Sequence, residues 1–285
     1  MNYQHAFHAG NFADVHKHVV LVRILLHLRQ KPAAFRVIDS HAGAGRYDLG
    51  ASEPTRGGEW REGIAPVWEK AQQQAIDKAT AALLKPYLDL VAGCNTAGSL
   101  RVYPGSPVIA QRLLRAQDRL IACELEPRSA AMLASTLRGD RRVKALSIDG
   151  WTAIGASVPP KERRGLVFID PPFEQRADFS RLPEMLKAAH RKWPTGIYLA
   201  WYPITGRETS SELARRLQRL EMAKLLRCEW ALREPRADAG LAGSGLIVVN
   251  PPFTLERDMQ ILLPALGRMV AAPGQGWQTI DWLAP

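Results

Sequence analysis

The sequence predicts an α/β protein with a doubly wound, mostly parallel sheet. Short apolar runs rich in β-forming residues alternate with helical segments, an order typical of parallel strands joined by crossover helices. Seven runs are expected as strands: Phe35–Asp39, Leu120–Glu124, Val143–Asp149, Gly165–Asp170, Gly196–Tyr202, Lys224–Leu232 and Leu246–Asn250. Helices are expected between them, for example at Pro107–Arg115, Ser129–Leu137 and Glu208–Leu220.

The last two predicted strands, Lys224–Leu232 and Leu246–Asn250, are expected to form an antiparallel hairpin. The stretch Glu234–Ser244 between them is rich in Gly and contains Pro, and it leaves no room for a packed crossover helix. We therefore expect Leu246–Asn250 to be an antiparallel strand at the edge of the sheet.

The pattern changes after the first predicted strand and indicates an inserted helical subdomain. Residues Arg61–Val91 are expected to be helical, since they are rich in Ala, Gln, Lys and Leu with an interruption at Pro86. No strand is expected from about Tyr47 to Leu100. The chain then divides into a main domain of residues 1–46 and 101–285 and a helical insertion of residues 47–100.

Composition points to a soluble protein that binds a polyanion. The 285 residues are 46% apolar, enough for a packed core, and 38 Lys and Arg against 28 Asp and Glu give a net charge of +10. Cys94, Cys123 and Cys228 are too far apart in sequence for a CxxC pair, which fits a reducing compartment. Since no run reaches 18 apolar residues, we expect a soluble cytoplasmic protein. Its oligomeric state is open at this point, with a monomer favoured.

A glycine turn directly follows the first predicted strand. Gly43 and Gly45 would let the backbone approach a ligand closely, at the strand end where open α/β sheets bind nucleotides. The third glycine of a dinucleotide fingerprint would fall at Asp48 and is missing, which disfavours an NAD-dependent oxidoreductase.

Acidic residues close the next two predicted strands. Glu124 could accept both ribose hydroxyls of an adenosine ligand, and Asp149, followed by Gly150, could accept from an adenine amino group. The alternative is that each carboxylate only caps the helix that follows it.

The segment Gly165–Phe173 is an apolar strand that ends in Asp-Pro-Pro-Phe. Two prolines fix the backbone, so the Pro171 carbonyl could lie beside the Asp170 carboxylate and offer two acceptors for the hydrogens of an exocyclic amine. The N6 lone pair of adenine is delocalised into the ring, and it becomes nucleophilic only when both hydrogens are held. Phe173 could stack on the extruded base.

Polar and aromatic side chains crowd the first eighteen residues. They are Tyr3, His5, His8, Asn11, Asp14, His16, Lys17 and His18. A metal site is the least favoured interpretation, since partner cysteines and an HExxH pattern are absent from the sequence. A polar lid formed by residues 1–30 is favoured, and an ordinary capped helix, Ala13–Arg29, remains the alternative.

Several segments together resemble one family, the bacterial 23S ribosomal RNA adenine-N6 methyltransferases J. They are Tyr3–Lys17, His41–Arg46, Tyr103–Pro107, Asp170–Phe173, Trp201–Pro203 and Asn250–Pro252. The resemblance implies a Rossmann-like methyltransferase fold, S-adenosylmethionine as cofactor and 23S ribosomal RNA as partner. It implies cofactor contacts at His18, His41, Ser106, Glu124, Asp149, Gly150 and Asp170, in addition to the glycine turn.

The same resemblance places the amino-terminal segment, with Tyr3, His5 and Lys17, beside the cofactor and the target base. One departure from methyltransferases in general is His41, which stands where the first glycine of their loop usually falls. A second motif of similar shape, Asn250-Pro251-Pro252-Phe253, is expected to be structural because an antiparallel strand would carry it away from the cofactor. A DNA adenine methyltransferase and a non-catalytic RNA-binding protein remain alternative readings of the sequence.

Overall fold

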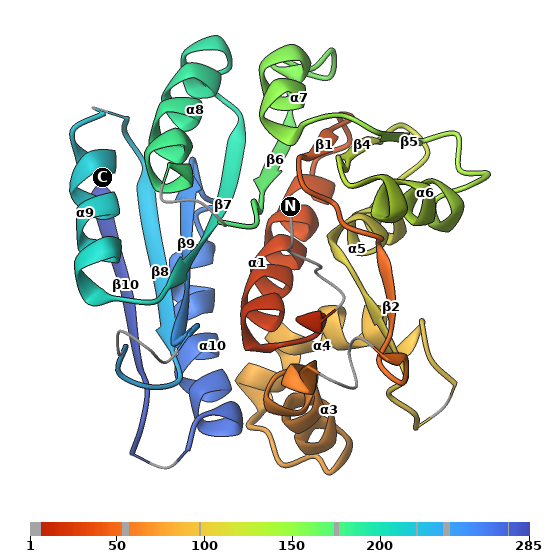
Figure 1. Cartoon of the computed structure of the whole chain (residues 1–285), viewed down its shortest axis with the longest axis vertical. Coiled ribbons are helices and arrows are strands. Elements are labelled where there is room, and N and C mark those ends of the chain that lie inside the picture. The colour runs from red at the N-terminus through yellow and green to blue at the C-terminus, as the bar shows by residue number, and fades with distance from the viewer. Residues whose placement is uncertain are drawn as a thin grey trace.

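An eight-stranded sheet organises the chain (Figure 1). The computed structural model describes residues 7–52, 57–96, 98–173, 177–220, 222–235, 240–272 and 274–285. The strands of the sheet are β1 (Arg36–Asp39), β4 (Arg119–Cys123), β5 (Val143–Leu146), β6 (Gly165–Ile169), β7 (Ile197–Ile204), β8 (Leu225–Ala231), β9 (Gly243–Val249) and β10 (Trp277–Ala284). Their order across the sheet is β10-β8-β9-β7-β6-β1-β4-β5.

Five strands, from β7 to β5 in this order, are mutually parallel, and β9 runs antiparallel to both β7 and β8. The predicted hairpin of β8 and β9 is therefore confirmed. The predicted edge position of β9 is wrong, because β9 lies between β7 and β8. The edge is β10, an eighth strand that the sequence did not predict, paired antiparallel with β8.

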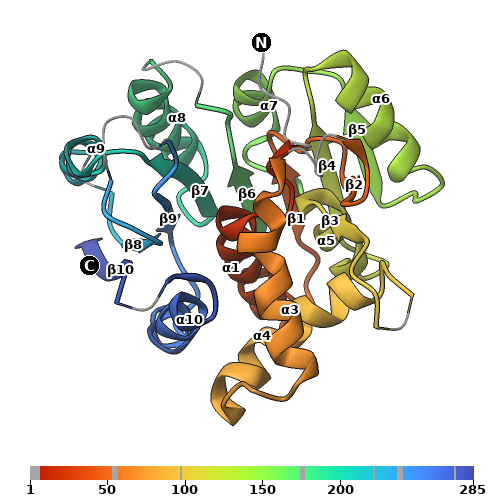
Figure 2. The ribbon, with the colours of Figure 1, turned by 60° about the horizontal axis from the view of Figure 1, so that its bottom comes forward.

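Helices cover both faces of the sheet (Figure 2). One face carries α1 (Phe12–Arg29), α5 (Ser106–Leu113), α6 (Pro127–Thr136) and α10 (Leu255–Val270), and the other carries α7 (Gly150–Ser157), α8 (Asp178–Lys192) and α9 (Arg207–Gln218). The alternation of side chains along a strand separates the two cores. In β6, Leu166 and Phe168 pack on the first face, and Val167 and Ile169 pack on the second.

The region between β1 and β4 is helical, but it is not one long helix. It contains the 3-10 helix η2 (Glu59–Glu62), α3 (Ile64–Gln72) and α4 (Lys78–Ala92). The expected break at Pro86 is wrong: Pro86 lies inside α4, and the chain turns instead at Gln74, where φ is 54°. The expectation of no strand is also wrong, because β2 (Arg46–Asp48) pairs antiparallel with β3 (Val102–Pro104) where the segment leaves and rejoins the main sheet.

The helix α1 belongs to the core of the protein. Asn11 caps it by accepting a hydrogen bond from the backbone N–H of Asp14 at 2.9 Å, and the polar residues Asp14, His16 and Lys17 are buried with its apolar ones. The capped helix that was the alternative prediction is thus confirmed for Phe12–Arg29. Residues 1–6, which include Tyr3 and His5, lie outside the described residues.

His16 ties α1 to the sheet through a shared hydroxyl. Its Nδ1 lies 3.0 Å from Ser244 Oγ, which also accepts a hydrogen bond from Trp201 Nε1 at 3.0 Å.

No helix in the described part of the chain has both the length and the apolar character needed to cross a lipid bilayer. Cys94, Cys123 and Cys228 are free thiols, as expected.

The buried His16 should make the stability of the protein depend on pH. Burial lowers the pKa of His16 from 6.5 to about 3. Between these pH values His16 is protonated in the unfolded chain but stays neutral in the folded protein. The free energy of unfolding should therefore fall with pH from about 6.5 towards 3, by about 1.4 kcal/mol per pH unit for this residue. Urea denaturation at several pH values measures it. Asn does not titrate, so in the variant His16→Asn the free energy of unfolding should depend less on pH between about 6.5 and 3. An unchanged pH dependence would contradict the lowered pKa of His16.

Candidate active site

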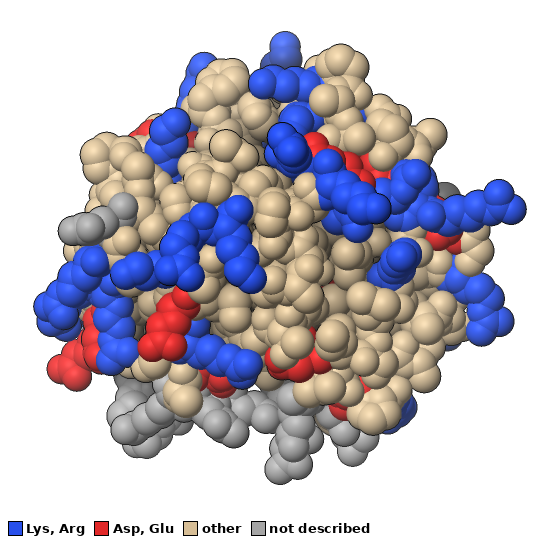
Figure 3. Space-filling view, turned by 90° about the horizontal axis from the view of Figure 1, so that it is seen from above, with Lys and Arg blue, Asp and Glu red and all other residues tan. Residues whose placement is uncertain are grey.

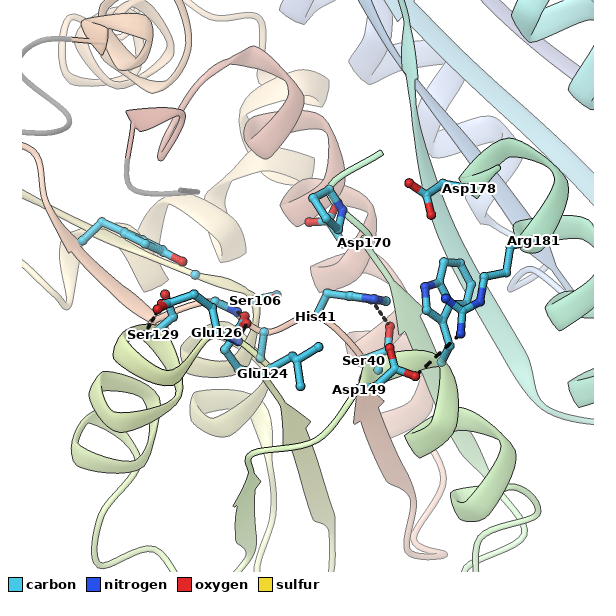
Figure 4. A pocket seen from close by; sticks show the side chains of 18 of the residues that line it. Ser40, His41, Ser106, Glu124, Glu126, Ser129, Asp149, Asp170, Asp178 and Arg181 are labelled. Carbon is cyan, nitrogen blue, oxygen red and sulfur yellow. Dashed lines mark hydrogen bonds and ion pairs between the residues drawn. The ribbon is translucent and has the colours of Figure 1, made fainter. Parts of the chain in front are cut away.

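A cavity of about 320 Å³ lies at the carboxyl ends of β1, β4 and β6 (Figure 4). This is the edge of the sheet at which the sequence placed the glycine turn and the Asp-Pro-Pro-Phe motif. Its lining includes His18, Ser40, His41, Gly43, Tyr47, Ser106, Glu124, Glu126, Ser129, Asp149, Gly150, Trp151, Asp170, Asp178 and Arg181.

The glycine turn after β1 is held by Glu124, which follows β4. Gly43 and Gly45 have φ values of 60° and 78°, which favour glycine. The Gly43 N–H donates to Glu124 Oε2 at 2.9 Å, and the Glu126 N–H donates to Oε1 at 2.8 Å. Glu126, not Glu124, caps helix α6, so the capping alternative is wrong for Glu124. Each Glu124 oxygen keeps a second lone pair for a ligand.

The end of β1 presents a buried carboxyl group, Asp39, that the sequence analysis did not select. Asp39 is 1% exposed and accepts a hydrogen bond from Ser106 Oγ at 2.7 Å. Burial raises the pKa of Asp39 to about 7, so its neutral and ionised forms are both populated near neutral pH. Its Oδ1 has no hydrogen-bond partner among the described residues. Ser106 thus acts from the first turn of α5 by orienting Asp39.

The far side of the cavity is formed by the start of α7. Asp149 caps this helix, because its Oδ2 accepts from the Thr152 N–H at 2.9 Å and from Thr152 Oγ1 at 2.8 Å. The capping role raised as the alternative is therefore real for Asp149, although the residue also lines the cavity. Arg181 of α8 lies 3.7 Å from Asp149. A ligand here would meet a carboxylate that is already fixed in position.

His41 and Trp151 form an aromatic wall beside Asp149. Their ring centroids are 5.3 Å apart in an edge-on arrangement, and the Arg181 guanidinium lies 4.9 Å from the Trp151 ring. Burial lowers the pKa of His41 to about 4, so its ring is neutral at pH 7. Ser40 Oγ is 2.8 Å from His41 Nδ1 and fixes the ring orientation.

Asp170 follows β6 and points into the cavity from the side of α1 (Figure 4). Its Oδ2 accepts a hydrogen bond from Lys17 Nζ at 2.6 Å, and the same ammonium lies 3.0 Å from Asp14 Oδ1. Burial alone would lower the pKa of Lys17, but the carboxylates of Asp170 and Asp14 outweigh it and raise the pKa above its ordinary value. Lys17 is therefore a buried cation shared by two acidic side chains.

Phe173 ends the Asp-Pro-Pro-Phe motif in a conformation that is unusual for its residue type. Its φ is 46°, in the left-handed region, and such outliers gather at functional sites. The ring packs 4.7 Å from Phe179 and 5.7 Å from Trp201, which lies under Lys17 Nζ at 4.7 Å. Phe173 is thus half-buried in an aromatic cluster beside the Lys17 and Asp170 pair.

His18 enters the cavity wall from α1, one residue after Lys17. Its Nδ1 is 2.8 Å from the Tyr103 hydroxyl, and this hydroxyl is 3.0 Å from that of Tyr87. His16 and His18, considered together as a metal pair, instead contact the separate partners Ser244 and Tyr103.

The structure brings together most of the side chains that the sequence singled out. Those lining the cavity are His18, His41, Gly43, Ser106, Glu124, Asp149, Gly150 and Asp170. Lys17 and Phe173 lie against Asp170 and Trp201, while Tyr3 and His5 fall outside the described residues. Sequence reasoning missed Tyr47, Ser129, Trp151, Asp178 and Arg181, which reach the cavity from strand β2 and from helices α6, α7 and α8. Only Trp151 had a sequence signal, its position directly after Asp149-Gly150.

The second Pro-Pro motif follows β9, which is antiparallel to β7. It therefore lies at the end of the strands that is remote from the cavity. Asn250 has a φ of 52°, and its Nδ2 donates to the carbonyls of Pro194 and Gly196, both at 2.8 Å. Asn250 therefore fastens the turn between α8 and β7. The predicted separation of this motif from the cavity is confirmed, although β9 is not an edge strand.

Comparison with known proteins places this geometry in a family. The family model described as "Ribosomal RNA large subunit methyltransferase D, RlmJ" matches residues 32–284. The chain belongs to this family. It is 39% identical over 285 residues to ribosomal RNA large subunit methyltransferase J of Escherichia coli, with 100% of this chain and 99% of the relative covered. It is 37% identical over 286 residues to the Haemophilus influenzae protein of the same name, with the same coverage.

A solved structure supports the same grouping. The crystal structure of a Legionella pneumophila protein is 34% identical in sequence and superimposes with a TM-score of 0.87, covering 96% of this chain and 98% of that one. The fold is thus the Rossmann-like methyltransferase fold that the resemblance implied, with eight strands in its sheet instead of seven.

Gly150 should be irreplaceable in this site. A Cβ at this position would lie 2.0 Å from the Ser40 carbonyl oxygen and 2.8 Å from His41 Cε1. The variant Gly150→Ala should therefore displace the loop after β1 and lower stability by about 2 kcal/mol or more. Gly155 of the same helix is the matched control, because an added Cβ there meets nothing within 4 Å.

Gly155→Ala should be neutral or stabilise the helix by up to about 1 kcal/mol. Thermal and urea denaturation of the two variants test the comparison. Equal stability of both variants would show that the close approach of α7 to Ser40 is not a constraint.

Proposed function

We propose that this protein transfers the methyl group of S-adenosylmethionine to the N6 amino group of an adenine in 23S ribosomal RNA. The observation that carries the proposal is Asp170: it ends a parallel strand at the cavity, is followed by two prolines and an aromatic residue, and is fixed by the buried Lys17. Membership of the ribosomal RNA methyltransferase family supports the same reaction.

The residues of the cavity fit S-adenosylmethionine. Gly43 and Gly150 line the cavity, and their lack of a side chain lets Tyr47 and Ser40 pack closely against the loops that would hold the ligand. The Glu124 carboxylate would accept from the ribose hydroxyls, and Asp149 would accept from the adenine amine beside the His41 and Trp151 wall. Ser106, whose hydroxyl donates to the buried Asp39 at 2.7 Å, lines the cavity and would meet the cofactor's amino-acid end.

The cofactor supplies an electrophilic methyl group on a positively charged sulfur. The protein's task is to make the adenine amine nucleophilic and to aim it. An oxygen of Asp170 and the carbonyl of Pro171 would accept the two N6 hydrogens, which holds the nitrogen in place as its geometry becomes tetrahedral. Because the pKa of this amine is far too high for a carboxylate to remove a proton first, the proton leaves after the methyl group has been transferred.

Lys17 keeps this arrangement rigid. Its ammonium holds one oxygen of Asp170 at 2.6 Å and favours the ionised carboxylate, which accepts hydrogen bonds more strongly than a neutral acid. A carboxylate that turned or took up a proton would no longer offer its acceptor to the amine. We infer that Lys17 acts on the target base through Asp170.

Phe173 is placed to stack on the extruded adenine. Its left-handed backbone at φ 46° sets the ring beside Trp201, next to Asp170. An aromatic face there would compensate part of the cost of removing the base from its stack. We propose the same neighbourhood for Tyr3 and His5.

The basic charge of the chain suits an RNA backbone. Groups of Lys and Arg are spread over the face shown in Figure 3, where they outnumber Asp and Glu. Lys161 and Arg163 are exposed, while Arg164 donates to the carbonyls of Ala33 at 2.7 Å and Leu28 at 3.1 Å. We propose Lys161, Arg163 and the helical insertion of residues 47–100 as contributors, in a protein that acts as a monomer in the cytoplasm.

Replacing Asp170 tests the reaction. Asp170→Ala should remove the acceptor and reduce transfer of labelled methyl to ribosomal RNA by about 1000-fold or more, while the protein stays folded because Lys17 keeps Asp14. Asp170→Asn keeps one acceptor without the charge, so a partial loss would indicate positioning by hydrogen bonds and a complete loss a need for the carboxylate. The control Asn250→Ala should methylate at the normal rate per folded molecule.

Two outcomes would contradict the proposal. Normal methylation by Asp170→Ala together with loss of activity in Asn250→Ala would mean that the two Pro-Pro motifs were assigned the wrong way round. Labelling of DNA, or of neither nucleic acid, would favour a DNA methyltransferase or a non-catalytic RNA-binding protein.

Salt should separate the two ligands. If the basic surface contacts about four phosphates, RNA affinity should fall by about 100-fold between about 50 and 200 mM salt, while S-adenosylmethionine affinity changes little. Filter binding and calorimetry measure the two affinities. The double variant Lys161→Gln, Arg163→Gln should have a shallower salt dependence, and a flat dependence in the unaltered protein would exclude a phosphate-tracking surface.

A further inference from the structure

We propose that Tyr87 and Tyr103 are positioning residues that fix the tautomer of His18, so that its Nε2 carries the proton and is a hydrogen-bond donor for the ligand. The tautomer follows from the hydrogen bonds that link His18 Nδ1, Tyr103 and Tyr87. The identity of the ligand rests on the proposed function.

Three buried side chains form the chain of contacts. The rings of His18 and Tyr103 stack with centroids 5.6 Å apart and an angle of 26° between their planes. The Tyr103 hydroxyl lies between His18 Nδ1, at 2.8 Å, and the Tyr87 hydroxyl, at 3.0 Å. Both tyrosines are completely buried, and His18 is 2% exposed. Tyr87 belongs to α4, Tyr103 to β3 and His18 to α1, so the contacts join the insertion to the cavity wall.

The direction of these hydrogen bonds follows from counting donors. Within the described part of the chain, the Tyr87 hydroxyl has Tyr103 as its one hydrogen-bond partner. If Tyr87 accepted this bond, its own hydrogen would be buried without an acceptor, which is unfavourable. Tyr87 therefore donates to Tyr103, and Tyr103 donates its hydrogen to His18 Nδ1. A neutral histidine that accepts at Nδ1 carries its proton at Nε2.

A hydrogen-bond donor at His18 Nε2 would offset the repulsion between the acidic cavity and a negatively charged group of the ligand. Five carboxyl side chains line it: Glu124, Glu126, Asp149, Asp170 and Asp178. They suit the ribose, the amines and the positive sulfur of S-adenosylmethionine, but they repel its carboxylate. Arg181 is held beside Asp149 and Trp151, on the side assigned to the adenine. We therefore assign the His18 Nε2–H to the carboxylate of the cofactor's amino-acid end.

The tautomer can be read directly from long-range 15N–1H correlation spectra of the full chain with labelled histidine. His18 is identified by the loss of its signals in His18→Asn. The unaltered protein should show a protonated Nε2 and an unprotonated Nδ1, and Tyr103→Phe should shift His18 towards a mixture of tautomers. Tyr198→Phe is the matched control, because it also removes a buried hydroxyl, one that donates to the Ala189 and Trp193 carbonyls away from His18. A protonated Nδ1 in the unaltered protein, or no change in Tyr103→Phe, would overturn the proposal.

Two ligands that differ in one group test the assignment of the carboxylate. Calorimetry should show that Tyr103→Phe weakens S-adenosylmethionine binding by about 2- to 10-fold, and Tyr87→Phe by less, because Tyr103 can still donate to His18. Decarboxylated S-adenosylmethionine should bind the unaltered protein, Tyr103→Phe and Tyr198→Phe with equal affinity. Equal losses for both ligands would reject the carboxylate assignment. Failure of the unaltered protein to bind either ligand would contradict the proposed function, whereas the tautomer measurement would stand by itself.

Discussion

The ammonium group of Lys17 is the constraint on which the site depends. It is 3% exposed and lies between Asp170 at 2.6 Å and Asp14 at 3.0 Å, so the two carboxylates together offset the cost of burying it. Removing one partner of a buried ion pair typically costs about 3–5 kcal/mol. This requirement fixes α1 against the end of β6, and with it His18 at the cavity wall and His16 against Ser244. The first helix of the chain is therefore part of the active site as well as part of the core.

Strand direction decides which of two similar motifs can act. Asp170 and Asn250 are each followed by Pro-Pro-Phe, yet one ends a parallel strand and the other an antiparallel one. The sequence predicted this difference, because the Gly-rich stretch Glu234–Ser244 before this strand leaves no room for a crossover helix. It did not predict β10, whose residues alternate polar and apolar weakly and pair only with β8 at the edge. Nor does the sequence predict the turn at Gln74, because Pro86 is the stronger helix-breaking residue in this segment.

The predictable part of the site is the part attached to strand ends. Glycines and carboxylates after β1, β4 and β6 converge because parallel strands end at one edge, and this is a property of local sequence. Arg181, Asp178 and Tyr47 reach the cavity through the packing of α8 and β2, which a single sequence does not specify. The contacts of Glu124 were also beyond the sequence: a carboxylate expected to bind a ligand first binds the loop that the ligand would contact.

The pairing of β2 with β3 has a consequence for how this family can vary. Arg46 lies opposite Pro104 and Asp48 opposite Val102, so the chain that leaves the main sheet returns to it within one pair of strands. The closure entropy of such a segment grows only slowly with its length, so its outer turns can lengthen or shorten without moving the glycine loop. The stem and α4 are different, because Tyr103 and Tyr87 project from them towards His18. Natural variation in length should therefore collect in the turns around η2 and α3, while the spacing from α4 to β3 stays constant.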